Sequence, residues 1–83
     1  MLKFDDNGWE DYLYLQSTNK NKAKKINSLI KECMRTPFSG IGKPEPLKGV
    51  YSGYWSRRID GEHRLIYSFE DVVLTIIACR FHY

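Results

Sequence analysis

A stretch rich in glycine and proline, residues 38–49, divides this sequence into two halves with different patterns. It reads Phe-Ser-Gly-Ile-Gly-Lys-Pro-Glu-Pro-Leu-Lys-Gly, and its three glycines and two prolines predict a loop with little regular structure. Before the loop, apolar residues recur at helical spacing; after it, β-branched and aromatic residues gather in short runs between turn residues. Helices followed by consecutive strands predict an α+β domain, with both helices packed on one face of a small antiparallel sheet.

Two helices are expected before the loop, preceded by a short strand at residues 2–4. Asp5, Asp6 and Asn7 are candidate caps for the first helix. Its expected apolar face comprises Trp9, Tyr12, Leu13 and Gln16. The second helix is expected to end at Pro37, because proline cannot continue a helix. Its expected buried face comprises Ala23, Ile26, Leu29, Ile30 and Cys33.

Three strands are expected after the loop. Residues 54–59 and 62–68 are expected to form a hairpin around Asp60-Gly61, a pair favoured in two-residue turns. A further turn leads to a β-branched strand over residues 72–81. The predicted order is therefore β-α-α-β-β-β, in a single domain over residues 1–83 whose second sheet face is free of helices.

The composition indicates an ordinary globular domain and excludes several other classes. The chain is 42% hydrophobic and 28% charged, which argues against disorder. Its net charge of +3 is compatible with a phosphate-bearing partner but is common in proteins without one. Two cysteines are too few for a disulfide framework, and the apolar run at residues 72–79 is far shorter than the roughly 20 residues of a membrane helix. We expect a cytoplasmic protein with free thiols and no membrane segment.

Metal-independent cleavage of RNA needs a general base, a cation that stabilises the phosphate and a general acid. Glu45 is the candidate base, because Pro44 and Pro46 hold it rigidly and rigid placement lowers the entropy lost in positioning. Lys48 follows three residues later and is a candidate contact for the same phosphate. The alternative is that Glu45 is an ordinary solvated loop carboxylate.

Arginines on the predicted hairpin are the candidate cations. Strand alternation directs Arg64 to the same face as Glu62. Arg57 and Arg58 are adjacent on the preceding strand and point to opposite faces, so at most one of them joins Arg64 in a phosphate clamp. For either one, the alternative is an ion pair with Asp60 or Glu62.

The C-terminal residues supply the candidate acid. His82 is the candidate acid, because an imidazole titrates near neutral pH. Tyr83 and Phe81 are candidates for stacking on RNA bases or, alternatively, for packing at the sheet edge. His63 faces away from Arg64 by parity and is interpreted as structural. His63, Cys79 and His82 are not spaced as a standard zinc ligand set, so no metal site is predicted.

Seven ordered blocks of sequence carry a resemblance to a known family. They are Trp-Glu-Asp-Tyr-Leu-Tyr at 9–14, Lys-Lys-Ile-Asn at 24–27, Arg-Thr-Pro-Phe at 35–38, Gly-Lys-Pro-Glu-Pro-Leu-Lys at 42–48, Ser-Gly-Tyr-Trp-Ser-Arg-Arg-Ile at 52–59, Glu-His-Arg-Leu-Ile-Tyr at 62–67 and Ala-Cys-Arg-Phe-His-Tyr at 78–83. Over essentially the whole chain, this arrangement resembles the YoeB toxins of the RelE/ParE toxin-antitoxin superfamily.

The resemblance implies a microbial-ribonuclease-like RelE fold and a toxin that inhibits translation. Such a toxin enters the ribosomal A site and cleaves the messenger RNA there by 2′-hydroxyl attack, leaving a 2′,3′-cyclic phosphate, without a cofactor. The implied partners are a cognate YefM-like antitoxin, the bacterial ribosome with its A-site messenger RNA, and a second copy in a homodimer. Operator DNA is implied only through the antitoxin complex.

The resemblance also implies a role for each candidate catalytic residue. Glu45 matches the general base and His82 the general acid. Arg64 matches the residue that stabilises transition-state charge, and Tyr83 the residue that orients the scissile nucleotide.

Three further residues match family positions near the site. Lys48 is implied to contact phosphate, and Arg58 and Glu62 are implied to bind RNA. Two other functions are open at this point: a ParE-like toxin that inhibits DNA gyrase by protein binding, and a non-catalytic RNA-binding module.

Overall fold

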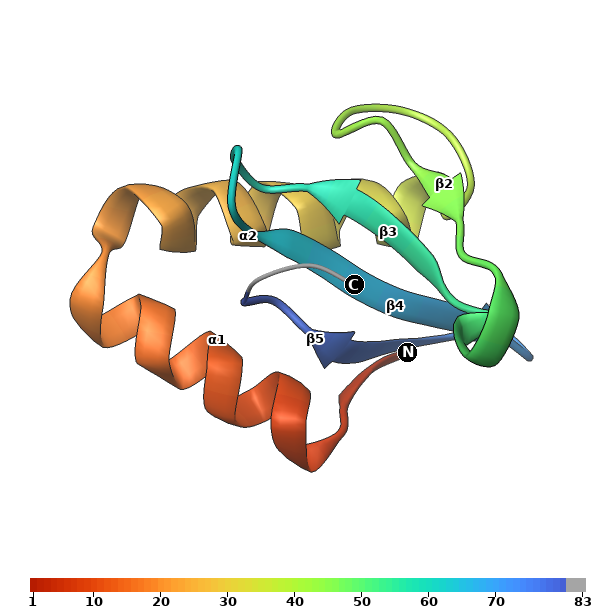
Figure 1. Cartoon of the computed structure of the whole chain (residues 1–83), viewed down its shortest axis with the longest axis horizontal. Helices are drawn as coiled ribbons and strands as arrows, with labels where there is room; N and C mark the ends of the chain where they lie inside the picture. The colour runs from red at the N-terminus through yellow and green to blue at the C-terminus, as the bar shows by residue number, and fades with distance from the viewer. Residues whose placement is uncertain (81–83) are drawn as a thin grey trace.

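The computed structural model of the chain describes residues 1–80; the candidate residues His82 and Tyr83 lie outside this range (Figure 1). Its elements are β1 (Leu2–Phe4), α1 (Asp6–Thr18), α2 (Lys20–Arg35), β2 (Glu45–Pro46), the 3-10 helix η1 (Gly49–Tyr51), β3 (Trp55–Arg58), β4 (Arg64–Glu70) and β5 (Val73–Ala78). The five strands form one sheet in the order β1-β5-β4-β3-β2. The predicted α+β fold, with two helices packed on a largely antiparallel sheet, is confirmed.

One edge of the sheet departs from the antiparallel prediction. β1 pairs with β5 in parallel, with Leu2 opposite Leu74 and Phe4 opposite Ile76. The other three pairings are antiparallel. The parallel pair brings the start of the chain beside its last strand, and α1 therefore begins next to β5.

Helix α1 is capped as expected but is rotated relative to the prediction. The Asp5 carboxylate is the cap and accepts a 2.7 Å hydrogen bond from the Gly8 amide. Leu15 is buried, whereas Trp9 and Leu13 are each 47% exposed, so the predicted apolar face is wrong for these two. The reason is that Gly8 and Leu15 face the sheet, and glycine carries no side chain that an apolar pattern would register.

Helix α2 supplies the larger part of the core, as predicted. All five residues of its predicted face are buried, and the helix ends at Arg35, with Thr36 as its cap before Pro37. The core cluster joins α2 to β4 and β5. It comprises Leu15, Ile26, Leu29, Ile30, Cys33, Ile59, Leu65, Tyr67, Leu74, Ile76 and Cys79.

The two-residue hairpin turn lies between β4 and β5, and not between β3 and β4 as the sequence predicted. Asp60-Gly61 is not a two-residue hairpin turn, because β3 ends at Arg58 and the Asp60 carboxylate accepts the amides of the two residues that precede β4, at 2.8 and 2.7 Å. The two-residue turn is Asp71-Val72, with φ of 52° and 62°. Positive φ at both central residues is what a type I′ hairpin requires.

No helix in the described part of the chain is long and apolar enough to cross a membrane.

Candidate active site

Glu45 lies on a short edge strand within the predicted loop. Its Cα is opposite that of Ser56, so β2 extends the sheet beyond β3. The flanking prolines fit an edge position, where a missing amide donor breaks no interior ladder. The loop prediction is therefore wrong for Glu45–Pro46, which β3 holds in register.

Arg64 meets Glu45 on the sheet face opposite the helices. Arg64 Nη1 donates to Glu45 Oε1 at 3.3 Å, and the Glu45 side chain is 59% exposed. Arg58 is opposite Arg64 in the β3–β4 register and is exposed. An exposed ion pair contributes little to stability. The arrangement instead places a carboxylate and two guanidinium groups together on the face opposite the helices.

Lys48 and Glu62 do not join this group. The Lys48 side chain is exposed, and no hydrogen bond or ion pair within residues 1–80 joins it to Glu45 or Arg64. Glu62 belongs to the connection between β3 and β4 and not to the Arg64 strand, so alternation does not extend to it. Its Oε1 lies 2.8 Å from His63 Nε2.

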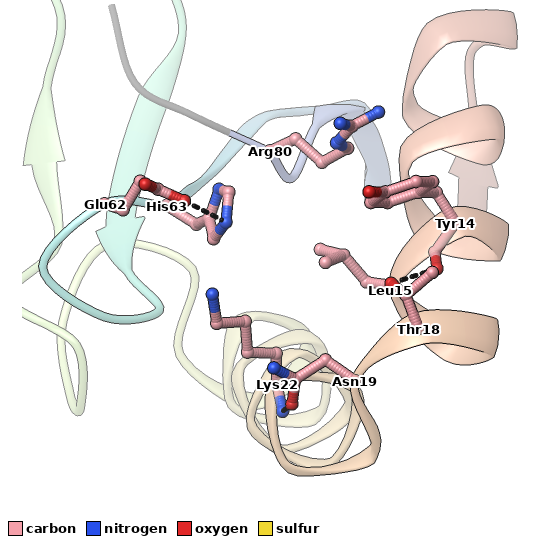
Figure 2. Close-up of a pocket in the computed structure, with 8 residues that line it drawn as sticks. All are labelled: Tyr14, Leu15, Thr18, Asn19, Lys22, Glu62, His63 and Arg80. Atoms are coloured by element: carbon pink, nitrogen blue, oxygen red, sulfur yellow. Dashed lines mark hydrogen bonds and ion pairs between the residues drawn. The ribbon is translucent and has the colours of Figure 1, made fainter.

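Glu62 and His63 line a cavity of about 320 Å³ between the α1–α2 turn and the β3–β4 connection (Figure 2). Its lining comprises Tyr14, Leu15, Thr18, Asn19, Lys22, Glu62, His63 and Arg80. His63 is buried, and its backbone binds Asp60 and Ile59. These contacts agree with the structural interpretation of His63.

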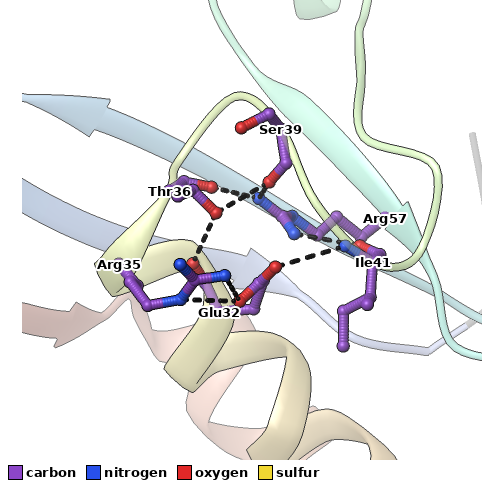
Figure 3. Close-up of polar contacts among 6 residues, drawn as sticks. All are labelled: Glu32, Arg35, Thr36, Ser39, Ile41 and Arg57. Atoms are coloured by element: carbon purple, nitrogen blue, oxygen red, sulfur yellow. Dashed lines mark hydrogen bonds and ion pairs between the residues drawn. The ribbon is translucent and has the colours of Figure 1, made fainter.

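Arg57 faces the helices and is fully buried, so of the two adjacent arginines it is Arg58 that faces Arg64. The Arg57 guanidinium donates to three carbonyls of the segment that follows α2 (Figure 3): Thr36 at 2.5 Å, Ser39 at 2.8 Å and Ile41 at 2.9 Å. Its Nε donates to the Tyr67 hydroxyl at 3.1 Å. We call this arrangement the Arg57 clamp.

The Arg57 clamp replaces the ion pair that was the alternative for this residue. Asp60 pairs instead with Lys22 at 3.1 Å. Burial raises the pKa of Tyr67 to about 12, although the neighbouring Arg57 opposes the shift. Strand parity separates Arg57 from Arg58, but the sequence has no signal for a guanidinium that binds three carbonyls.

Glu32 supports the same segment from α2. It accepts hydrogen bonds from Arg35 at 2.8 Å and from the Ile41 amide at 3.4 Å. The hydrogen bond from Arg35 lowers the pKa of Glu32. The segment between α2 and β2 is therefore held from both sides before it reaches Glu45.

Among residues 1–80, no group of three or more His, Cys, Asp or Glu side chains is placed to hold a metal ion.

Nearly the whole chain is similar to known bacterial toxins. Residues 4–83 match the family described as the YoeB-like toxin of the bacterial type II toxin-antitoxin system. The chain is 58% identical over 82 residues to Toxin YoeB of Escherichia coli (strain K12), which covers 99% of this chain and 98% of that protein.

Solved structures of such toxins have the same fold. The YoeB/ParE toxin from Agrobacterium tumefaciens has a TM-score of 0.96 at 50% identity, covering 99% of this chain and 98% of that one. YoeB of Staphylococcus aureus was solved in a YoeB-YefM complex (TM-score 0.92, 46% identity, coverage 100% and 97%). It was also solved as a dimer (TM-score 0.91, 46% identity, coverage 99% and 95%).

The fold is that of a small α+β bacterial toxin, with the candidate residues Glu45, Arg58 and Arg64 on the sheet face that the helices leave open. The chain belongs to the YoeB-like toxins of bacterial type II toxin-antitoxin systems.

Proposed function

We propose that this toxin is a metal-independent endoribonuclease that cleaves messenger RNA in the ribosomal A site. The observation that carries the proposal is the 3.3 Å contact between Arg64 and Glu45 on an open sheet face, with Arg58 opposite Arg64. This contact joins two residues, 19 positions apart in the chain, that we propose as the base and the cation of RNA cleavage.

In the proposed reaction, Glu45 takes the proton of the 2′-hydroxyl, and the 2′-oxygen attacks the adjacent phosphorus. Arg64 and Arg58 donate hydrogen bonds to the phosphate oxygens as negative charge develops on them. His82 donates a proton to the departing 5′-oxygen as the P–O5′ bond breaks. The products are a 2′,3′-cyclic phosphate and a free 5′-hydroxyl.

Tyr83 and Lys48 complete the proposed binding of RNA. Tyr83 orients the scissile nucleotide by stacking on its base. Lys48, exposed just after β2, contacts a neighbouring phosphate. Glu62 has a weaker claim to a role in RNA binding, because its carboxylate contacts His63 and lines the cavity on the other side of β4.

The exposure of Glu45 is the reason for proposing that the ribosome positions the messenger RNA for cleavage. A Glu45 side chain that is 59% exposed lies on an open surface, which by itself holds a flexible RNA strand weakly. Orienting the 2′-hydroxyl and the phosphate accounts for much of the barrier to such a reaction. A ribosome that presents the A-site codon in a fixed geometry supplies that orientation.

Its proposed partners follow the assemblies of its relatives. A YefM-like antitoxin would inhibit this toxin, as the YoeB-YefM complex of Staphylococcus aureus suggests, and operator DNA would be bound only through that complex. The YoeB dimer of the same organism supports a homodimer. The toxin would act in the cytoplasm, where the ribosomes are.

The proposal is tested with purified toxin, ribosomes and a defined messenger. We expect cuts within the A-site codon and 2′,3′-cyclic phosphate ends, unchanged by added zinc or manganese. Glu45→Gln and His82→Ala should each lower the cleavage rate about 10²-fold or more, the scale of a lost general base or acid. Glu70→Gln removes another exposed carboxylate of the same sheet and is the matched control.

Uncut messenger together with inhibited gyrase supercoiling would instead support the ParE-like alternative. Messenger binding that is equal before and after His82→Ala, with no product in either case, would support a non-catalytic RNA-binding module.

A further inference from the structure

Three side chains of α1 hold the last described residues of the chain. Asn7 Nδ2 donates to the Ile77 carbonyl at 3.0 Å, and Asp11 Oδ2 accepts the Cys79 amide at 3.1 Å. The third contact is between Arg80 and the ring of Tyr14, with 3.7 Å from the guanidinium carbon to the ring centroid, a cation–π geometry.

The spacing of these three side chains matches one face of α1. Asn7, Asp11 and Tyr14 stand at positions i, i+4 and i+7, which lie in a row along a helix. Asn7 also donates to Asp11 at 3.4 Å, which links the first two members. We call this row, which follows the chain from Ile77 to Arg80, the α1 track.

A β-bulge explains why β5 needs the α1 track at this point. β4 pairs Tyr67 with Ile76 and then Ile66 with Ala78, so Ile77 is an extra residue in β5. A bulge bends its strand and interrupts the ladder of hydrogen bonds. Asn7 binds the Ile77 carbonyl, and the α1 track guides the chain after the bend.

Close packing of α1 on β5 keeps the α1 track in reach. The Asp5 amide donates to the Ile76 carbonyl at 3.0 Å. A Cβ placed on Gly8 would lie 2.2 Å from that same carbonyl oxygen, so the helix approaches the strand as closely as glycine allows. The α1 track therefore extends from a rigid contact and is not a set of isolated surface side chains.

We propose that Asn7, Asp11 and Tyr14 are positioning residues for the C-terminal catalytic residues. By holding Cys79 and Arg80, the α1 track fixes the position and direction in which the chain leaves Arg80, two positions before His82 in the sequence. The inference rests on the proposed function, because it assigns the general acid to His82. Displacement of a catalytic group by about 1 Å can cost about 10²-fold in rate. The cleavage rate should therefore be sensitive to the placement of Cys79 and Arg80.

The contacts of the α1 track contribute little to the stability of the fold. Asn7 is exposed and Tyr14 is 46% exposed, so their contacts are partly hydrated. The helix is held independently by Leu15 in the core and by the Gly8 approach.

The experiment measures ribosome-dependent cleavage by Asp11→Ala and Tyr14→Ala and by the double variant. We expect kcat of the double variant to fall about 10-fold or more, with KM for the programmed ribosome changed less than about 3-fold. Asp11→Asn keeps an acceptor for the Cys79 amide and Tyr14→Phe keeps the ring, so both should retain most of the rate. Leu13→Ala alters an exposed residue on another face of α1, and Glu10→Ala removes an exposed carboxylate that flanks the row without belonging to it; both are matched controls.

A spectroscopic readout accompanies the kinetics and does not depend on cleavage. The NMR signals of the His82 imidazole should shift in Asp11→Ala and Tyr14→Ala, and stay unchanged in Glu10→Ala and Leu13→Ala. Thermal unfolding identifies any variant that is merely unstable. If an alanine variant is unstable, Asp11→Asn and Tyr14→Phe are compared with the native toxin in its place.

The outcomes separate this inference from the proposed function. If the unaltered toxin leaves the messenger uncut on ribosomes, the proposed function fails, and if Glu45→Gln cleaves at the native rate, only the assignment of Glu45 as the base fails. If Glu45→Gln abolishes cleavage while the double variant keeps the native kcat and His82 signals, the α1 track has no positioning role. A loss confined to KM, or an equal loss in the conservative and alanine variants, would also overturn the inference.

Discussion

Arg57 and Arg58 are consecutive residues of the same type, yet they belong to two different regions of the molecule. Arg57 is fully buried on the helix side, where three carbonyls and one hydroxyl occupy its donors. Arg58 is exposed on the open side, opposite Arg64. A guanidinium with four hydrogen bonds to the protein stabilises the fold, whereas an exposed one, as Arg58 is within residues 1–80, is the better candidate for binding phosphate. Strand alternation assigns the two roles by a shift of one residue.

The largest effect should come from Arg57→Met. This change leaves three loop carbonyls and the Tyr67 hydroxyl without their donor, and unsatisfied buried polar groups cost about 1–3 kcal/mol each. We expect the free energy of unfolding to fall by about 3 kcal/mol or more in urea titrations. Arg58→Met should change it by less than about 0.5 kcal/mol. Equal losses would break the comparison between the two sides.

Arg64→Gln should have the opposite profile on the open side. We expect cleavage to slow by about 10²-fold, because a donor to the developing phosphate charge is lost, with no change in the urea midpoint. Single-turnover cleavage on programmed ribosomes measures the rate. Lys25→Gln removes an exposed cation from α2 and is the control. A large loss of unfolding free energy in Arg64→Gln, without a change in the cleavage rate, would show that Arg64 has a structural role like that of Arg57.

Two buried groups, Tyr67 and Cys79, predict that the free energy of unfolding falls at alkaline pH. Burial raises the pKa of Tyr67 from 10.0 to about 12 and that of Cys79 from 9.0 to about 12. The native state therefore keeps these protons when the unfolded chain has lost them, and stability falls as pH rises from about 9 towards 12. We expect a decline on the order of 5 kcal/mol in the free energy of unfolding by about pH 12, since one unit of pKa shift corresponds to about 1.4 kcal/mol. Urea titrations at a series of pH values measure it, and a flat profile from about pH 9 to 11 would contradict it.

The smallest effect concerns the β4–β5 turn, which belongs to neither region. Val72 has a φ of 62°, where a β-branched residue is strained, and it is 74% exposed. Val72→Gly should raise the free energy of unfolding by about 0.5–1 kcal/mol and leave cleavage unchanged. Val50→Gly alters another exposed valine, outside the positive-φ positions, and should give no gain. A destabilised Val72→Gly protein would show that strain at this turn is absent.

How far the sequence predicts this fold depends on how local each signal is. The buried face of α2 is predictable in full, because five apolar residues recur at helical spacing over the core. The rotation of α1 is not, because Gly8 marks its contact face by the absence of a side chain. The turn at Asp60-Gly61 is missed because the Asp60 side chain itself binds the backbone.

The candidate site is predictable only in part, for a similar reason. Parity correctly separates Arg57 from Arg58, but no local pattern tells which face the helices cover. The approach of Arg64 to Glu45 depends on β2 joining the sheet edge, a long-range pairing that a glycine- and proline-rich segment conceals. The resemblance to a toxin family predicts Glu45 and Arg64 as candidates, whereas only the structure shows that their side chains are in contact.

The Arg57 clamp has a consequence for how the toxin is made. It joins carbonyls of residues 36–41 to a guanidinium 16 to 21 positions later in the chain. During synthesis the segment that leads to Glu45 emerges before Arg57, so the contacts from the β3 side form after those from Glu32 of α2 become possible. A nascent chain that ends before β3 therefore contains both helices and Glu45 but lacks both the guanidinium that holds this segment and the strand with which β2 pairs.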